Sequence, residues 1–276
     1  DKSAQLPNFR FFGNVEYGSE VTLDDLRKHY HQVMFSTGAP FDRNLGVPGE
    51  DLDGCFSATE FVAWYNGHPD FSERKFDLSQ ENVVIVGVGN VAMDLARMLC
   101  KTHEELSVTD VADHALEALK NSKVKNVYIL GRRGPAQAAF TPPEIKELGE
   151  FEDADVTVPY EEAKVDAASL ALIENDKNAL KNINFISEYA ERAIEGKSRL
   201  LTIRFLVSPV EVLGADGKVK SVKVVKNKLV ENQDGTVRPV ASEETENIPA
   251  GLIFRSVGYK GKPLPDIPYD ENSGTI

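Results

Sequence analysis

Apolar residues in the middle of the chain fall into short continuous runs separated by amphipathic stretches. Val83–Val86 and Asn126–Leu130 are apolar runs rich in β-branched residues and flanked by polar residues, the pattern of strands buried on both faces. Apolar positions recur at helical spacing over Val91–Cys100 and Val108–Lys120. A third apolar run covers Gly251–Ser256. Strands that alternate with helices predict an α/β fold built on a parallel sheet.

After residue 200 the pattern changes, and apolar residues begin to alternate with polar ones. Val210–Leu213 and Val219–Lys226 flank Ala215-Asp216-Gly217, which is a strong signal for a tight hairpin turn. Gly235 predicts a second hairpin turn further along. We expect a β-hairpin excursion inserted before the last parallel strand.

The first 45 residues contain too few predicted elements to close a sheet. We expect strands at Phe9–Val15 and Gln32–Phe35, with a helix over Thr22–Tyr30 between them. The second strand runs into Ser36–Ala39, an S-T-G-A turn that recurs at the edge of the nucleotide site in flavoproteins with two dinucleotide sites. A plain glycine turn explains the same four residues, and both interpretations stay open at this point.

Two expected helices begin with the Ser/Thr-x-x-Glu pattern of a capping box. Ser57 and Glu60 open a helix that ends near Tyr65, and Thr141 and Glu144 open another. Further helices are expected around 167–174 and 176–191.

The strand at residues 83–86 leads into its helix through Gly87-Val88-Gly89-Asn90-Val91-Ala92. This is a G-x-G-x-x-A turn in the strand–turn–helix context that dinucleotide binding requires. Gly87 allows the tight turn, Gly89 lets a pyrophosphate approach the backbone, and the small Ala92 lets the helix pack closely on the strand. We predict a Rossmann-like nucleotide site with Gly87, Gly89, Asn90, Val91 and Ala92 as its residues; a structural glycine turn is the alternative.

Arg132 and Arg133 follow the second strand, where a Rossmann unit meets the adenosine ribose. An acid at this position accepts the 2′-hydroxyl of NAD, whereas arginine accommodates the 2′-phosphate of NADP. Guanidinium groups match a phosphate bidentately, so the pair favours NADP(H) over NAD(H). A surface arginine pair on a loop is the alternative.

Composition narrows the class of protein. The net charge of −13 and the sequence pI near 4.9 argue against general binding of nucleic acid or anionic membranes. No apolar run approaches the roughly 18 residues of a membrane span. Cys55 and Cys100 form no C-x-x-C pair, and the histidines lack metal-ligand spacing. We expect a cytoplasmic enzyme without a metal site.

Tyr160 and Lys164 have the Y-x-x-x-K spacing of the acid/base pair of short-chain dehydrogenases. Those enzymes also need a T-G-x-x-x-G-x-G turn, which differs from the turn in this chain, and an upstream serine where this chain has Glu147. A flavin-free dehydrogenase that uses this pair is therefore a minor alternative.

Six blocks of the sequence share their order and spacing with one family. They are FGNVEYG (12–18), STGA (36–39), VPGEDLDGCFSATEFVAWYNG (47–67), GVGNVAMDLARML (87–99), YILGRRGPAQAAFTPPEIKEL (128–148) and GLIFRSVGYK (251–260). Through these blocks, which cover nearly the whole chain, it resembles the adrenodoxin-reductase-type ferredoxin–NADP⁺ reductases.

The resemblance implies two domains. An FAD domain is made from the first and last parts of the chain, and an NADP domain is inserted between them. We expect partial FAD-domain flanks at 1–45 and 258–276 and the NADP(H)-binding domain at 46–257. In the family, NADPH delivers hydride to FAD, and FAD passes single electrons to a ferredoxin-like iron–sulfur protein.

The resemblance also carries site residues over by motif. Gly89, Asn90, Val91 and Ala92 would hold the pyrophosphate, and Arg132 with Arg133 would grip the 2′-phosphate. Glu144 matches a family residue that contacts the nucleotide. Val15 and Gly38 would border the adenosine side of FAD.

The family's N-terminal glycine loop for FAD and its C-terminal G-W-x-x-x-G-P-T-G segment do not occur in this sequence. We therefore expect the NADP-binding portion of a longer reductase, inactive by itself because hydride transfer needs a flavin held against the nicotinamide. The region that corresponds to the family's ferredoxin-docking helix, Asn175–Arg192, has only Lys177, Lys181 and Arg192 as basic residues, which puts docking there in question. A glutamate-synthase small-subunit-like flavoprotein and a non-catalytic NADP-binding module remain alternatives.

Overall fold

The computed structural model describes residues 2–276. Contacts divide the chain into two compact units, one of residues 42–258 and one that joins the residues up to Phe41 to residues 259–276. Almost all of the buried apolar core belongs to the larger unit. The assignment of the two end segments to an FAD domain remains a prediction.

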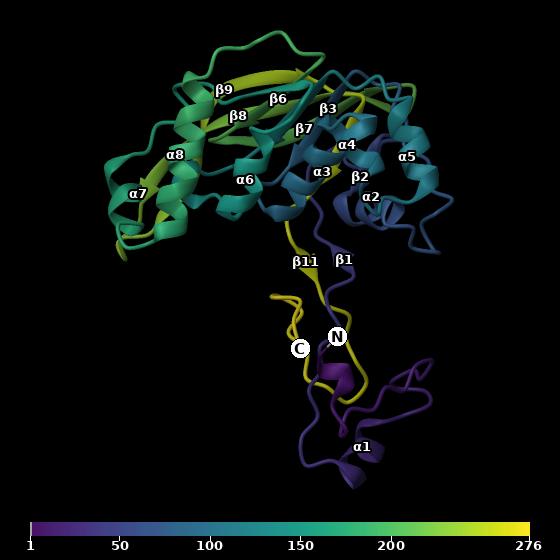
Figure 1. Cartoon of the computed structure of the whole chain (residues 1–276). Coiled ribbons are helices and arrows are strands. Elements are labelled where there is room, and N and C mark those ends of the chain that lie inside the picture. Colours follow the sequence, from purple (N-terminus) through teal and green to yellow (C-terminus); the bar gives the residue numbers. More distant parts are fainter. Residues whose placement is uncertain (1) are drawn as a thin grey trace. The chain divides into compact units, whose positions relative to one another are not determined.

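A six-stranded parallel sheet forms the centre of the larger unit (Figure 1). In spatial order its strands are β2 (Cys55–Ser57), β10 (Leu252–Arg255), β3 (Asn82–Val86), β4 (Asn126–Leu130), β6 (Arg199–Arg204) and β5 (Ala154–Thr157). Val86 pairs with Leu130 and Leu130 with Arg204, so β3, β4 and β6 end together at one edge. The predicted α/β fold with a parallel sheet is confirmed.

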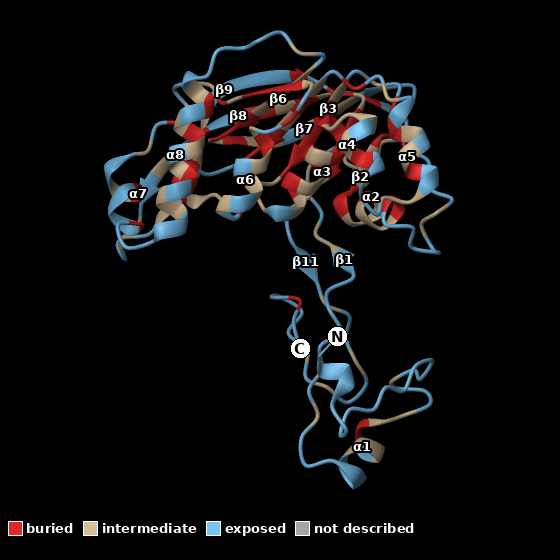
Figure 2. Cartoon of the chain, in the orientation of Figure 1, coloured by how far each residue is buried: buried red, intermediate tan, exposed pale blue. Residues whose placement is uncertain are grey.

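Different layers cover the two faces of this sheet. On β3, Val83 and Ile85 pack into a core shared with the helices, whereas Val84 and Val86 pack against an antiparallel sheet. Both faces of the strand are therefore buried (Figure 2), which is why Val83–Val86 is continuously apolar. The helices of this unit are α2 (Ala58–Tyr65), α3 (Asn90–Cys100), α4 (His103–Ser107), α5 (Asp113–Lys120), α6 (Pro142–Leu148), α7 (Ala167–Leu172) and α8 (Lys177–Glu191), with a 3₁₀ turn η2 (Pro135–Gln137).

The antiparallel sheet is the predicted hairpin excursion. It consists of β7 (Val207–Ala215), β8 (Lys218–Glu231) and β9 (Val237–Pro249), in that spatial order. Asp216 and Gly217, with φ of 52° and 75°, form the turn between β7 and β8. Both central residues lie in the left-handed region, as a tight two-residue hairpin turn requires.

One helix prediction in the larger unit needs correction. A single helix over Val108–Lys120 is wrong, because α4 ends at Ser107 and α5 begins at Asp113. Between them Val108 is 86% exposed, and the backbone amide of Ala112 donates to Tyr65 O. The helical spacing of apolar residues over Val108–Lys120 was therefore not the buried face of a single helix.

The two predicted capping boxes had different outcomes. The box of Ser57 and Glu60 is present, and both of its reciprocal hydrogen bonds form. The box of Thr141 and Glu144 is wrong, because the Thr141 side chain makes no cap bond at the start of α6.

The smaller unit has little regular structure. Its elements are η1 (Ser3–Gln5), α1 (Leu23–His29) and most of a two-stranded sheet of β1 (Phe41–Asp42) with β11 (Tyr259–Lys260). The predicted helix is confirmed, but the strands expected at Phe9–Val15 and Gln32–Phe35 are wrong. The Tyr17 hydroxyl donates to Pro265 O at 2.8 Å, so the first and last parts of the chain meet within this unit.

Candidate functional site

The turn between β3 and α3 has the backbone geometry that the G-x-G-x-x-A pattern predicts. Gly87 has φ of +129°, and a Cβ built on it would lie 2.0 Å from Ser256 O, so no side chain fits there. Gly89 is the N-cap of α3 and makes no side-chain cap bond; a Cβ built on it would meet nothing within 4 Å. The first glycine is thus demanded by the protein, whereas the second leaves open space beside the N-terminus of an eleven-residue helix.

Ala92 lies one turn into α3 and is fully buried. Its amide donates to Gly89 O at 3.0 Å, and its side chain belongs to the core that α3 shares with β3. A larger side chain would push the helix away from the sheet, which is the packing reason for alanine at this position.

Arg132 and Arg133 lie in the loop that follows β4, and both are exposed. The loop touches the glycine turn, because a Cβ built on Gly131 would lie 2.8 Å from a methyl carbon of Val88. The turn and the arginine pair therefore follow neighbouring strands at one edge of the sheet, where doubly wound folds bind nucleotides. The assignment of these residues to NADP(H) stays a prediction.

Residues 138–141 border the glycine turn on another side. The amide of Ala139 donates to Val88 O at 2.9 Å, and the amide of Thr141 donates to the Asn90 side-chain oxygen at 2.9 Å. Asn182 of α8, itself buried, donates from its side chain to Phe140 O at 2.8 Å. Asn90 thus fastens the start of α6 to the start of α3, a role that the motif alone does not indicate.

Glu144 forms an ion pair with Arg97 of α3 at 2.7 Å. Arg97 also pairs with Asp94 and with Glu147. Burial lowers the pKa of Arg97, but hydrogen bonds to Asp94 and Glu147 and the attraction of their charges outweigh burial, so the pKa of Arg97 is raised overall. In this structure Glu144 therefore joins α6 to α3, and its predicted contact with the nucleotide is untested.

The two residues predicted to border FAD lie in the smaller unit. Val15 is 50% exposed. Gly38 has φ of +71°, and a Cβ built on it would meet nothing within 4 Å. Both leave room for a ligand, and their assignment to FAD stays a prediction.

Several other groups give no support to a separate reactive centre. Tyr160 is 59% exposed, and Lys164 Nζ lies 4.9 Å from the centre of its ring while pairing with Glu161. Burial raises the pKa of the Cys55 thiol to about 11 and that of Cys100 to about 12, so both stay protonated.

Within residues 2–276, no cluster of three or more His, Cys, Asp or Glu side chains is arranged to hold a metal ion. No helix in the same part of the chain has the length and apolar character needed to cross a bilayer.

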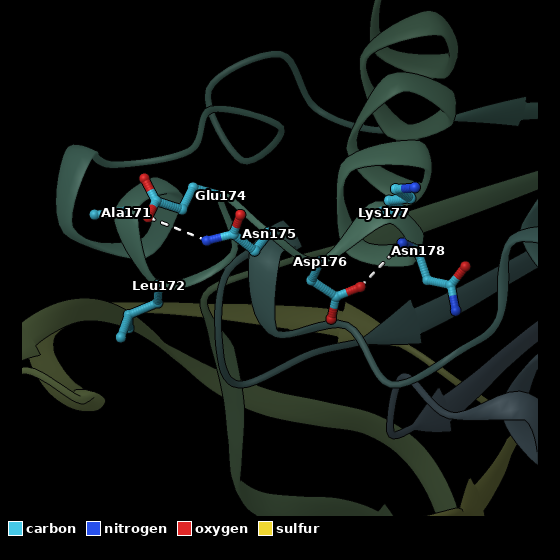
Figure 3. Close-up of a pocket in the computed structure, with 7 residues that line it drawn as sticks. All are labelled: Ala171, Leu172, Glu174, Asn175, Asp176, Lys177 and Asn178. Atoms are coloured by element: carbon cyan, nitrogen blue, oxygen red, sulfur yellow. Dashed lines mark hydrogen bonds between the residues drawn. The ribbon is translucent and has the colours of Figure 1, made fainter.

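A shallow hollow of about 820 Å³ lies at the junction of α7 and α8 (Figure 3). Its lining residues are Ala171, Leu172, Glu174, Asn175, Asp176, Lys177 and Asn178. Asp176 turns its carboxylate to the start of α8 and accepts from the amides of Asn178 and Ala179 at 2.9 and 3.0 Å. The protein's own carboxylate therefore already occupies this helix start, and none of the lining residues belongs to the glycine turn or the arginine loop.

No family model matches the chain, but its sequence is similar to several curated proteins. Among curated proteins, NADPH-ferredoxin reductase FprA of Mycobacterium leprae is 42% identical over 282 residues, which take in 100% of this chain and 60% of that protein. The mitochondrial NADPH:adrenodoxin oxidoreductase of Arabidopsis thaliana is 37% identical over 281 residues, with 99% of this chain and 58% of that protein covered.

A solved structure described as Mycobacterium tuberculosis FprA in complex with NADPH superposes with a TM-score of 0.92 at 42% identity. The match covers 100% of this chain and 60% of that one. The chain thus spans about 60% of the length of the relatives it matches. Over that span it belongs to the adrenodoxin-reductase-type family of ferredoxin–NADP⁺ reductases.

Proposed function

We propose that this chain is the NADP(H)-binding portion of an FAD-dependent oxidoreductase that passes electrons between NADPH and a ferredoxin-like iron–sulfur protein. The observation that carries the proposal is the meeting of two features at one sheet edge. The open turn at Gly89 and the exposed pair Arg132–Arg133 follow the adjacent strands β3 and β4.

Each feature has a part of the nucleotide that it fits. The backbone N–H groups at the start of α3 and the helix dipole favour the pyrophosphate, which can approach closely where Gly89 leaves space. Arg132 and Arg133 offer planar guanidinium donors to the 2′-phosphate that distinguishes NADP from NAD. The site therefore combines a general dinucleotide turn with a charge that selects NADP(H).

The proposal predicts how nucleotide affinity changes when an arginine is removed. R132A or R133A should weaken NADP⁺ binding by about 10- to 150-fold, because each loses a charge-assisted bond, and should leave NAD⁺ binding nearly unchanged. Lys125→Ala is the matched control, since Lys125 is an exposed cation that pairs with Glu81 and precedes the same strand at its opposite end. Isothermal titration measures all the affinities. Tighter binding of NAD⁺ than of NADP⁺ by the unaltered chain would refute the assignment.

FAD, when bound, accepts hydride from NADPH and hands on single electrons. In this chain Val15 and Gly38 would border its adenosine side. The sequence contains one G-x-G-x-x-[GA] turn, so its residues fit NADP(H) more completely than FAD. We propose that this portion binds NADP(H) without turning over by itself; flavin absorbance that persists after gel filtration of the chain with FAD would contradict this.

The electron acceptor is the finer part of the proposal. Of the three basic residues on and next to α8, Arg192 is already engaged: it pairs with Glu188 and lies 4.9 Å from the centre of the Tyr189 ring. Lys177 and Lys181 remain as the cations for an acidic ferredoxin. Binding of such a ferredoxin should weaken as salt increases. An absence of binding at low salt would favour an acceptor of the glutamate-synthase type or a non-catalytic NADP-binding module.

A further inference from the structure

We propose that Asn227, on the central strand of the antiparallel excursion, is a positioning residue for the arginine pair and thereby sets selectivity for a 2′-phosphate. Its side-chain nitrogen donates to Arg132 O at 2.8 Å. The proposal rests on the proposed function, because it concerns the same nucleotide site. It gives the excursion, which lies outside the dinucleotide motif, a part in recognition.

The backbone of the arginine loop is held from the β6–β7 corner. The amide of Gly131 donates to Arg204 O at 2.8 Å, and Gly131 O accepts from Val207 N at 3.0 Å. Arg133 O accepts from Leu206 N at 3.1 Å. With the bond from Asn227, the carbonyls of three consecutive loop residues all have partners in the β6–β8 segment. The two arginine side chains are exposed, so their directions depend on this backbone.

Two consecutive buried residues, Val224 and Val225, change the inward side of β8 just before Asn227. Up to this point Val222 and Val224 are buried, and beyond it Val225 and Asn227 are buried, so Asn227 lies on the inward side. The pairing of β8 with β9 shifts register between Val225 and Asn227. At this shift β8 advances from Val225 to Asn227 while β9 advances from Thr245 to Ala241, so the extra residues lie on β9. With strict alternation residue 227 would share the outward side with Lys223, and irregular pairing of this kind commonly re-aims a side chain.

Asn227 is 7% exposed, and its side-chain nitrogen donates two hydrogen bonds. Its amide donates to Leu206 O at 2.7 Å, and its side chain also donates to Ser208 Oγ at 2.8 Å. Leu206 has φ of +57°, an unfavourable region for a branched side chain. The left-handed corner at Leu206 thus directs its amide to Arg133 and its carbonyl to Asn227. A strained corner and a buried amide that both end on the arginine loop point to recognition, where such strain tends to be stored.

The test separates this role from plain support of the fold. The probes are 2′,5′-ADP and 5′-AMP, which differ only in the 2′-phosphate, titrated into the full chain. N227A should weaken the binding of 2′,5′-ADP about five- to tenfold, because one hydrogen bond to the arginine loop is lost, and should leave the binding of 5′-AMP unchanged. N227D keeps the shape but cannot donate to Arg132 O, and its charge opposes a phosphate, so its loss should be larger. Asn247→Ala is the control, since Asn247 is exposed on β9 of the same sheet and pairs with Lys223.

The outcomes are distinct. A loss confined to 2′,5′-ADP in both Asn227 variants supports the proposal. Equal losses for both probes, unfolding of either variant, or no loss at all would overturn it in favour of a purely structural role. If the unaltered chain does not prefer 2′,5′-ADP to 5′-AMP, the NADP(H) assignment itself fails; if it does, a negative result for Asn227 refutes only this inference.

Discussion

Replacing Gly87 by alanine should destabilise the larger unit by about 2–6 kcal/mol, from two costs that add. A residue with a side chain at φ of +129° is strained by roughly 1–3 kcal/mol. The new Cβ would also lie 2.0 Å from Ser256 O, which cannot move freely because Ser256 N donates to Val86 O at 2.8 Å. Relieving such a clash costs roughly 1–3 kcal/mol, since it displaces the end of β10.

Replacing Gly89 by alanine should have the opposite profile. Gly89 has φ of −107° and ψ of 176°, which any residue adopts, and a Cβ there meets nothing within 4 Å. Alanine gains about 0.4–1 kcal/mol from a less flexible unfolded chain, and loses a similar amount because it is a poor N-cap. Stability should therefore stay within about 0.5 kcal/mol. The methyl group would, however, occupy the space through which a pyrophosphate reaches the start of α3.

Urea unfolding followed by circular dichroism, together with NADP⁺ titration, distinguishes the two glycines. G87A should lower the free energy of unfolding. G89A should weaken NADP⁺ binding at least tenfold, a loss of about 1.4 kcal/mol in binding free energy, and should leave the urea midpoint unchanged. The reasoning is refuted if G87A unfolds at the same urea concentration as the unaltered chain, or if G89A binds NADP⁺ normally.

Two further predictions concern charges that hold the larger unit together. Arg97→Met should cost about 2 kcal/mol of stability, because it leaves Glu144 and Glu147 close together without their shared cation; an unchanged urea midpoint would contradict this. Burial raises the pKa of Asp155, but the amides of residues 195–197 outweigh it and hold the pKa below 3.8. The stabilisation that the Asp155 carboxylate provides is thus present above pH 3.8 and is lost as the pH falls through its lower pKa in the folded state. Between neutral and acidic pH, the unfolding free energy of Asp155→Asn should therefore fall less steeply than that of the unaltered chain.

The elements that sequence patterns predicted well are those whose burial is determined locally. Val83–Val86 and Asn126–Leu130 are apolar because both faces of a central strand are covered, and that requirement is visible in the residues themselves. The Asp216–Gly217 turn was equally readable, since few residues adopt positive φ without cost.

The predictions that failed depended on partners that the pattern does not reveal. Phe11 and Phe12 lie in a stretch predicted as a strand, yet they are 81% and 72% exposed and have no neighbouring strand. Apolar residues make a strand only where another strand or core accepts them. The box expected from Thr141 and Glu144 failed for a similar reason, because the Glu144 carboxylate is drawn to Arg97 on another helix.

The proposed nucleotide site also has a part that a local motif predicts and a part that depends on distant residues. The turn proposed for the pyrophosphate can be described by a motif, because its glycines and its small alanine lie within the six residues Gly87–Ala92. The arginine pair is also visible in the sequence, but its backbone is held by residues near 204–208 and by Asn227, almost a hundred positions further along the chain. Asn227 faces the loop because the inward side of β8 changes between Val224 and Val225, and a lone asparagine among alternating lysines and valines gives no sign of that. The proposed dinucleotide site can therefore be predicted from its motif, whereas the proposed choice between NADP and NAD would depend on long-range bonds that only the folded chain brings together.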